Sequence, residues 1–234
     1  MKIERKFDEF DHFANDYREI HNQNLKLSGV TSDYFSEHKI QILNDNEQVD
    51  SINFLDFGCG DGNSAIHFSN YFPNSIYNGI DISSEIINVA NSLATNNTNF
   101  QTFDGMNIPF EDSTFDVVFT ACVFHHIDFT LHENLLFEIK RVLKPNGKFY
   151  IFEHNPWNPV TRHIVNTCPF DADAVLLSPT YTKKTLNKIF NNTITNYILF
   201  FPRHKLFNPF IKLEGLLSKI PLGGQYYTVS KKII

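Results

Sequence analysis

The chain has 234 residues, of which 42% are hydrophobic and 20% charged, so its composition is that of a globular domain rather than of a disordered or fibrous protein. Its net charge of −6 argues against a nucleic-acid partner, and no basic leader or long apolar run is present, so we expect a cytoplasmic protein without stable membrane insertion. Three scattered cysteines and one adjacent histidine pair, His125 and His126, predict neither a disulfide framework nor a metal site.

The first fifty residues are predicted to form helices that cover the rest of the fold. Four aromatic side chains recur at helical spacing and share one face: Phe7, Phe10, Phe13 and Tyr17. A second helix is expected after the break at Ser28 and Gly29, with its cap at Thr31 or Ser32. Residues 1–50 are therefore assigned to an N-terminal helical cap.

Residues 52–64 read as an apolar strand, a glycine-rich turn and the start of a helix. Gly58 and Gly60 belong to a G-x-G-x-G run that permits positive φ and lets a ligand lie directly on the backbone. This spacing differs from the G-x-G-x-x-G of dinucleotide-binding turns. Asp56 and Asp61 flank the turn and would repel a diphosphate, whereas they would attract a ligand with cationic groups, such as S-adenosylmethionine (SAM).

The next strand, 75–81, ends at Asp81, about where a doubly wound fold places a carboxylate that accepts hydrogen bonds from ribose hydroxyls. An alternative role for Asp81 is to cap the following helix, because Ser83, Ser84 and Glu85 come next. The remaining elements up to residue 153 are predicted as a helix at 85–93, strands at 99–103, 117–121 and 148–153, and a helix at 131–142.

Several blocks of this sequence resemble the class I SAM-dependent methyltransferases, and in particular the methyltransferase type 11 group. They are the glycine-rich turn, F-D-H-F-A-N-D-Y at 10–17, D-G-M-N-I-P-F at 104–110, F-D-V-V at 115–118 and R-V-L-K-P-N-G at 141–147. Asn146 replaces the first glycine of the family's last block, which is a mild departure because asparagine tolerates left-handed backbone.

The resemblance implies an α/β fold: a Rossmann-like, doubly wound, seven-stranded and mostly parallel sheet with an antiparallel edge hairpin and N-terminal cap helices. Strands at 194–201 and 225–229 would form the hairpin. The resemblance also implies a set of SAM contacts, with Asp104 at the adenine: Tyr17, Asp56, Gly58, Gly60, Asp81, Ile82, Asp104, Gly105, Met106 and Ala121. Cys122 is an alternative to Ala121.

Candidates for a catalytic base lie beyond the ends of strands 117–121 and 148–153, because open α/β sheets bind ligands at that edge. They are His125, His126, Glu153 and His154, of which the last three are assigned as catalytic; each is otherwise a hydrogen-bonded loop residue. Trp157 and Arg162 are predicted to line the substrate pocket, and Asp171 and Asp173 are further candidates for substrate contacts.

Residues 1–234 are expected to form a single domain with two substrate-side insertions, 154–179 and 202–224. The second insertion carries an apolar stripe suited to a lid, a homodimer contact or a peripheral membrane contact: Phe210, Leu213, Leu216, Leu217 and Ile220. From Arg203 onward the sequence contains six basic residues and one acidic residue. This excess of positive charge fits a solvent-exposed rim of the fold, or a surface that contacts an anionic substrate or membrane.

The predicted function is transfer of the SAM methyl group to a small-molecule acceptor, with S-adenosylhomocysteine as the product. A sugar- or glycan-derived or lipid-linked metabolite is favoured as the acceptor. Two alternatives stay open: a non-catalytic partner subunit that keeps the fold, and a nicotinamide-dependent oxidoreductase.

Overall fold

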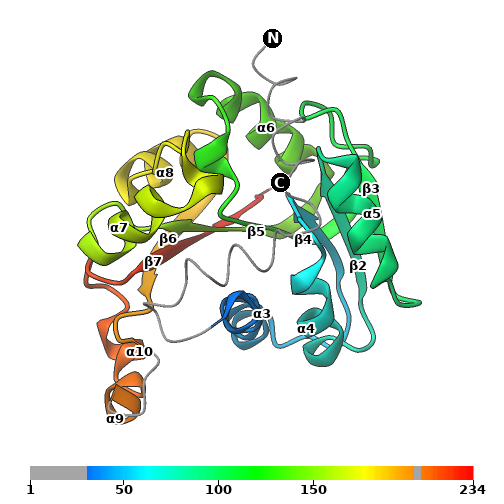
Figure 1. Cartoon of the computed structure of the whole chain (residues 1–234). Coiled ribbons are helices and arrows are strands. Elements are labelled where there is room, and N and C mark those ends of the chain that lie inside the picture. Colours follow the sequence, from blue (N-terminus) through cyan, green and yellow to red (C-terminus); the bar gives the residue numbers. More distant parts are fainter. Residues whose placement is uncertain (1–30, 203–206, 234) are drawn as a thin grey trace.

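The computed structural model describes residues 31–202 and 207–233, and within them the chain forms one seven-stranded sheet with helices on both faces (Figure 1). In spatial order the strands are β3 (Thr98–Thr102), β2 (Ile76–Asp81), β1 (Asn53–Phe57), β4 (Phe115–Ala121), β5 (Leu143–His154), β7 (Gln225–Lys231) and β6 (Asn191–Ile198). The first five strands of this order pair in parallel, and β7 runs antiparallel to both β5 and β6.

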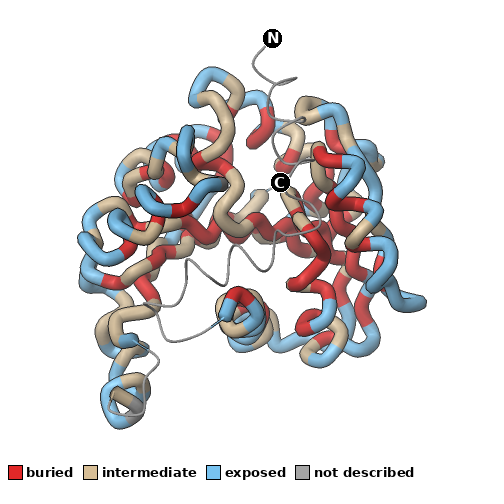
Figure 2. The backbone as a smooth tube through the Cα atoms, viewed as in Figure 1, coloured by how far each residue is buried: buried red, intermediate tan, exposed pale blue. Residues whose placement is uncertain are grey.

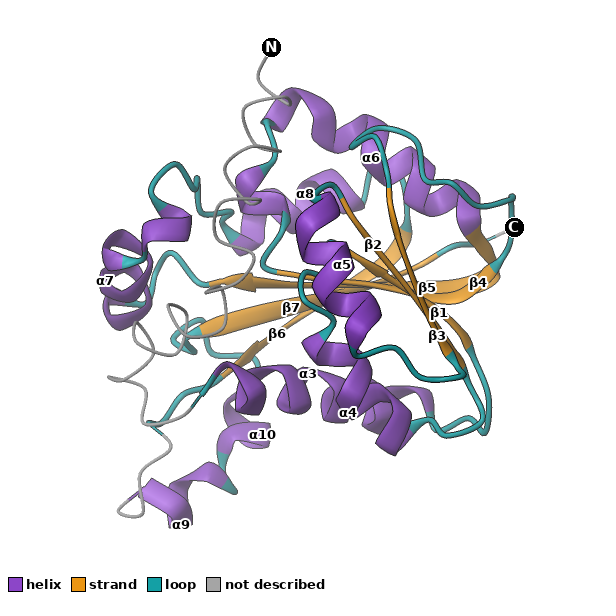
Figure 3. Ribbon diagram, turned by 45° about the vertical axis from the view of Figure 1, so that its right-hand side comes forward, coloured by secondary structure: helices purple, strands orange, loops and turns teal. Residues whose placement is uncertain are grey.

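The helices form a layer on each side of the sheet (Figure 3). Three helices come before β4, the middle strand of the sheet, in chain order: α3 (Ser32–Glu47), α4 (Asn63–Tyr71) and α5 (Ser84–Ser92). Three come after it: α6 (Phe129–Val142), α7 (Pro159–Thr167) and α8 (Pro179–Leu186). The remaining short helices are α9 (Asn208–Ile211) and α10 (Glu214–Leu217), with the 3-10 turns η2 (Phe124–His126) and η3 (Pro169–Asp171). Helices α9 and α10 extend away from the sheet (Figure 1).

Successive side chains along each strand point to opposite faces of the sheet, so the core has two halves, one on each face. On β1, Leu55 and Phe57 belong to the cluster covered by α6 and α8, whereas Phe54 belongs to the cluster covered by α3 and α4. The buried tube in Figure 2 follows the strands at the centre of the molecule. The sheet is therefore a rigid base on which the loops at its carboxyl edge are held.

The predicted fold is confirmed, including the antiparallel hairpin formed by β6 and β7 at one edge. The strand bounds differ from the predicted ones by a few residues, and the N-cap of α3 is Thr31, one of its two predicted cap residues. Asn146 has φ 67°, so its predicted left-handed conformation is also confirmed. The aromatic helix and Tyr17 lie outside the described residues.

The two predicted insertions contain short helical segments. Residues 154–179 hold α7 and η3, and the described part of 202–224 holds α9 and α10. Among the described residues no helix combines the length and apolarity that a bilayer crossing requires.

Candidate functional site

The glycine-rich turn joins the end of β1 to the start of α4. Gly58, Gly60 and Gly62 have φ of 78°, 53° and 76°, a backbone region that L side chains rarely adopt. The turn is tied to β2, because the N–H groups of Gly58 and Cys59 both donate to the Ile80 carbonyl at 2.8 and 3.0 Å. The switch point of the strand order lies here, since β1 pairs with β2 on one side and with β4 on the other.

Two of these glycines are required for different reasons. A Cβ on Gly58 would lie 2.4 Å from Val123 Cγ2, so the loop after β4 presses on the bare backbone. Within residues 31–202 and 207–233, a Cβ on Gly60 would meet nothing within 4 Å. Gly58 is thus needed for packing, while Gly60 leaves open space beside its main chain.

Asp81 connects the end of β2 to the glycine-rich turn. Its Oδ2 accepts the Gly60 N–H at 3.0 Å, and its Oδ1 accepts the Ser83 N–H at 3.1 Å. The cap of α5 is Ser83, whose hydroxyl accepts the Ile86 N–H. The carboxylate is therefore held at the carboxyl edge of the sheet, directly beside the turn.

Asp104 organises the loop that follows β3. Its Oδ1 accepts the N–H groups of Met106 and Asn107 at 2.8 and 2.6 Å, and hydrogen bonds from Asn107 hold the pKa of this carboxyl below its usual range. Gly105 has φ 77°. Arg141 fixes the far side of the loop, since its guanidinium donates to the Ile108 and Phe110 carbonyls at 2.8 Å each. The arginine of the 141–147 block is thus a support for the predicted adenine loop.

Asp56 lies beneath the turn and is only 2% exposed. The Tyr77 hydroxyl donates to its carboxylate. Burial raises the pKa of Asp56 to about 7, partly opposed by the Tyr77 hydrogen bond and by the charge of Lys39. Lys39 comes from α3 and is itself buried, and its charge also acts on Cys122 and His154 at the ends of β4 and β5. The sequence did not indicate a functional role for Lys39, because a lysine on a predicted surface helix is expected to be exposed to solvent.

A cluster of ionisable side chains lies at the carboxyl ends of β4 and β5. His125 and His126 are on η2, Glu153 and His154 end β5, and Asp171 is on η3. Glu153 is fully buried; its Oε1 accepts the Phe124 N–H at 3.0 Å, and its Oε2 lies 2.6 Å from His125 Nδ1. The structure thus brings all four predicted base candidates to one edge of the sheet, where Asp171 joins them.

The charges of this cluster shift each other's pKa values. Burial alone would lower the pKa of His125, but the charge of Glu153 and hydrogen bonding with Asp171 and Glu153 raise it to about 10. Burial and the charge of His125 lower the pKa of His154 to about 4. Burial would raise the pKa of Asp171, but hydrogen bonds with His125 and His126 lower it strongly. The cluster is an ion-pair network of buried imidazoles and carboxylates.

The remaining predicted residues occupy separate places. Ile82 and Ala121 are half-buried next to the ends of β2 and β4, and Cys122 has φ 60°, a strained conformation for a residue with a side chain. Trp157 stacks on Tyr197 of β6 with ring centroids 6.5 Å apart, and Arg162 is exposed on α7. The proposed roles of these residues in binding stay predictions.

Comparisons with known proteins agree on one family. Residues 55–151, which span β1 to most of β5, match the family described as "Methyltransferase domain". The chain is 35% identical over 117 residues to the uncharacterized methyltransferase YcgJ of Bacillus subtilis, covering 48% of this chain and 45% of that protein. It is 28% identical over 131 residues to the fatty-acid O-methyltransferase of Mycolicibacterium smegmatis, covering 53% of this chain and 46% of that protein.

A solved structure from Thermotoga maritima, described as a SAM-dependent methyltransferase and possible histamine N-methyltransferase, superposes with a TM-score of 0.69 at 16% identity. The superposition covers 97% of this chain and 99% of that one. At this identity the likeness shows the fold. The chain spans less than half the length of the two curated relatives named above.

Proposed function

We propose that the chain, whose residues 55–151 match the methyltransferase domain family, is a class I SAM-dependent methyltransferase that transfers the SAM methyl group to a small-molecule acceptor. The observation that carries this proposal is the bare Gly60 backbone beside the Asp81 carboxylate at the switch point of the sheet. S-adenosylhomocysteine is then the second product.

The residues around the turn fit SAM chemically. Open space beside Gly60 admits a ligand against the backbone, and the Asp81 carboxylate suits ribose hydroxyls. Asp104, Gly105 and Met106 form the loop that would hold the adenine. Lys39 would pair with the carboxylate of the methionine part, because a buried cation needs an anionic partner. Asp56, Tyr17, Ile82 and Ala121 complete the proposed contacts.

When bound, SAM supplies a methyl group on a sulfonium, which a nucleophile displaces in line. The protein's contribution is to hold the acceptor on that axis and to exclude water, which can lower the barrier by about 7–11 kcal/mol. The acceptor would lie against the cluster at the ends of β4 and β5. Glu153 is fully buried and receives hydrogen bonds from Phe124 and His125, so its proposed part is to position His125. His126 and His154 remain the proposed residues that face the acceptor.

For the acceptor, we favour a sugar- or glycan-derived or lipid-linked metabolite. The exposed apolar side chains of the α9–α10 segment support an acceptor with an apolar part: Phe210, Leu213, Leu216, Ile220 and Leu222. Arg162 and Trp157 are both exposed on the 154–179 insertion and are proposed to contact a polar group at the reacting end. A single domain over residues 1–234, a cytoplasmic location and a homodimer belong to the same proposal.

Binding of the cofactor is tested by titrating S-adenosylhomocysteine into purified protein with calorimetry. Asp81→Asn removes a charged acceptor of hydroxyl hydrogen bonds, each worth about 1.5–3 kcal/mol, and is expected to weaken binding roughly 10- to 100-fold. Asp50→Asn changes an exposed carboxylate before β1, at the opposite edge of the sheet, and is the matched control. Equal affinities for the two variants would overturn the cofactor assignment, and binding of NAD instead would favour an oxidoreductase.

The acceptor class is tested by incubating the protein with methyl-labelled SAM and a cell extract, followed by partition into aqueous and lipid phases. Label in lipid is the expected result for a lipid-linked acceptor, and label in water-soluble material would point to a free sugar-derived metabolite. If S-adenosylhomocysteine binds but neither phase gains label, the chain is a non-catalytic subunit that keeps the fold.

A further inference from the structure

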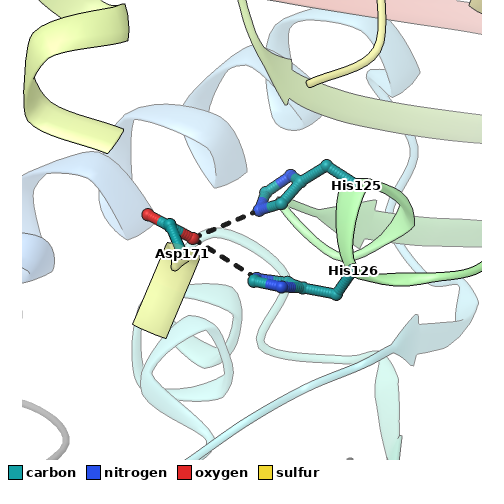
Figure 4. A group of neighbouring side chains, drawn as sticks. All are labelled: His125, His126 and Asp171. Atoms are coloured by element: carbon teal, nitrogen blue, oxygen red, sulfur yellow. Dashed lines mark ion pairs between the residues drawn. The ribbon is translucent and has the colours of Figure 1, made fainter. Parts of the chain in front are cut away.

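Three side chains from two segments that are distant in the sequence converge on one point at the carboxyl edge of the sheet (Figure 4). His125 Nε2 and His126 Nε2 each lie 3.4 Å from Asp171 Oδ1, and one donor atom of each residue lies within 4.8 Å of the other two. We infer that His125, His126 and Asp171 form a binding site for a divalent first-row transition-metal ion such as Zn²⁺.

The spacing of the donor atoms fits such an ion. Bonds of about 2.0–2.2 Å at tetrahedral angles place two ligand atoms roughly 3.3 Å apart. The two nitrogen–oxygen distances of 3.4 Å match this value, whereas they are long for an N–H···O hydrogen bond. His125 Nε2 is buried, and its contact with Asp171 Oδ1 at 3.4 Å lacks the geometry of an ordinary hydrogen bond; the side chain of His125 is 1% exposed. Because a buried polar atom without a well-formed hydrogen bond is costly, a ligand at this point would stabilise it.

His125 also has a carboxylate at hydrogen-bond distance from its other nitrogen. Glu153 Oε2 lies 2.6 Å from His125 Nδ1, whereas Asp173 Oδ1 lies 3.9 Å from His126 Nδ1, which is beyond hydrogen-bond distance. Histidines that bind metals almost always donate their second N–H to such a partner, which fixes the ring and directs the lone pair of Nε2 at the ion. Glu153 is itself held by the Phe124 N–H, so the orientation of His125 is built into the end of β5.

The charges and the donor types select the class of ion. Two carboxylates, Glu153 and Asp171, would balance a double positive charge when the imidazoles are neutral, and their side chains are 0% and 13% exposed. Two imidazole nitrogens with one carboxylate favour zinc or iron over calcium or magnesium. Three protein ligands leave a coordination position open, as in catalytic rather than structural zinc sites. That position would accept water or an oxygen of a second ligand.

No metal site was predicted here, because histidines that are adjacent in a sequence rarely direct their rings at the same ion. In the structure the rings of His125 and His126 lie with centroids 4.2 Å apart, since both sit on the tight η2 turn. The inference rests on this side-chain geometry and does not depend on the proposed methyl transfer.

The test is a zinc titration of the full chain, prepared without a histidine tag and freed of metal with a chelator. Calorimetry is expected to show one equivalent of tightly bound Zn²⁺, and Co²⁺ is expected to give the intense visible bands of a four-coordinate nitrogen–oxygen site. Asp171→Asn and His126→Gln change side chains that are 13% exposed, so these variants are expected to fold, with zinc affinity lowered 100-fold or more. Glu153→Gln removes only the outer partner and is expected to cost about 10- to 100-fold.

His163→Gln is the matched control, because His163 is exposed on α7 and outside the cluster. Absence of stoichiometric zinc binding by the wild-type protein would overturn the inference, as would equal losses in the control and in Asp171→Asn. The Co²⁺ spectrum decides the matter on wild-type protein alone if a variant does not fold, since weak six-coordinate bands would also overturn it. S-adenosylhomocysteine binding, measured on the same samples, separates failure of the metal site from failure of the proposed function.

Discussion

Replacing Gly58 by alanine tests why the turn after β1 needs a glycine at its first position. The new Cβ would lie 2.4 and 2.9 Å from the two γ-methyl groups of Val123, closer than real Cβ atoms come to other atoms. In addition, Gly58 has φ 78°, where alanine is strained. The variant should therefore lose stability through both packing and backbone strain.

The magnitude follows from these two terms. A non-glycine residue in left-handed backbone costs about 1–2 kcal/mol, and overpacking a close contact costs about 1–3 kcal/mol. The lower chain entropy of alanine in the unfolded state returns about 0.4–1 kcal/mol. The free energy of unfolding of Gly58→Ala is thus expected to fall by roughly 2–4 kcal/mol.

Urea unfolding followed by circular dichroism measures this loss, and a second substitution separates its two parts. Val123→Ala removes both clashing methyl groups and by itself should cost about 1–1.5 kcal/mol, because Val123 is half-buried. The loss of stability in the double variant should then be about 1–3 kcal/mol smaller than the sum of the two single losses, because only the backbone strain at Gly58 remains. Additive losses in this cycle would refute the packing argument.

Gly60→Ala is the matched comparison, because its Cβ meets nothing within 4 Å in the part of the chain that the structure describes, and its φ is 53°. It should cost only about 1–2 kcal/mol of stability. Its added methyl group would nevertheless enter the space proposed for SAM, so S-adenosylhomocysteine affinity should fall at least about tenfold, or about 1.4 kcal/mol. A Gly60→Ala variant that binds normally would place the ligand elsewhere.

Three further predictions concern residues around the turn. Lys39→Gln should weaken the binding of S-adenosylhomocysteine, measured by calorimetry, roughly tenfold. The affinity for methylthioadenosine, which lacks the carboxylate, should not change, and equal losses for the two ligands would exclude the proposed ion pair. Asp56 has its folded-state pKa raised to about 7 from 3.8, so its contribution is full below about pH 4 and is lost as the pH rises through 7. His154, whose folded-state pKa is lowered to about 4, changes stability in the opposite direction over this pH range, so the test is the difference in urea stability between wild type and Asp56→Asn. This difference should shift by about 2–4 kcal/mol against the wild type between pH 4 and pH 7, and a constant difference would refute the assignment. Arg141→Ala leaves the Ile108 and Phe110 carbonyls without its hydrogen bonds and should cost about 1–3 kcal/mol in thermal or urea unfolding; Arg141→Lys should not restore it, because lysine lacks the fork.

The sheet could be predicted from local patterns because each of its strands carries its own signal. Apolar runs of strand length ended at turn residues, and Asp81 and Asp104 stood directly after two of them. Asn146 could be assigned a left-handed backbone from residue type alone. These features depend on neighbours within a few positions, which a sequence shows directly.

The details of the site depend on contacts between residues far apart in the chain. Nothing near Gly58 indicated that Val123 would press on it, and nothing near His125 indicated that Asp171, from an insertion after β5, would approach its Nε2. Lys39 was equally invisible, because its burial follows from the packing of α3 on α4 and not from its own helix. Pattern reasoning finds residues that act through their own backbone and misses residues that act through a tertiary partner.

The glycine-rich turn shows how one motif can carry two constraints that the sequence does not separate. Gly58 and Gly60 look equivalent in the G-x-G-x-G run, yet one is closed off by Val123 and the other faces open space. A glycine forced by packing would be required even in a protein that had lost its ligand, whereas a glycine forced by the ligand would not. Gly60 has φ 53°, so its backbone favours glycine with or without a ligand, and among the described residues its added Cβ would touch nothing. The difference in S-adenosylhomocysteine affinity between Gly60→Ala and Gly58→Ala therefore measures whether the open side of the turn binds the ligand.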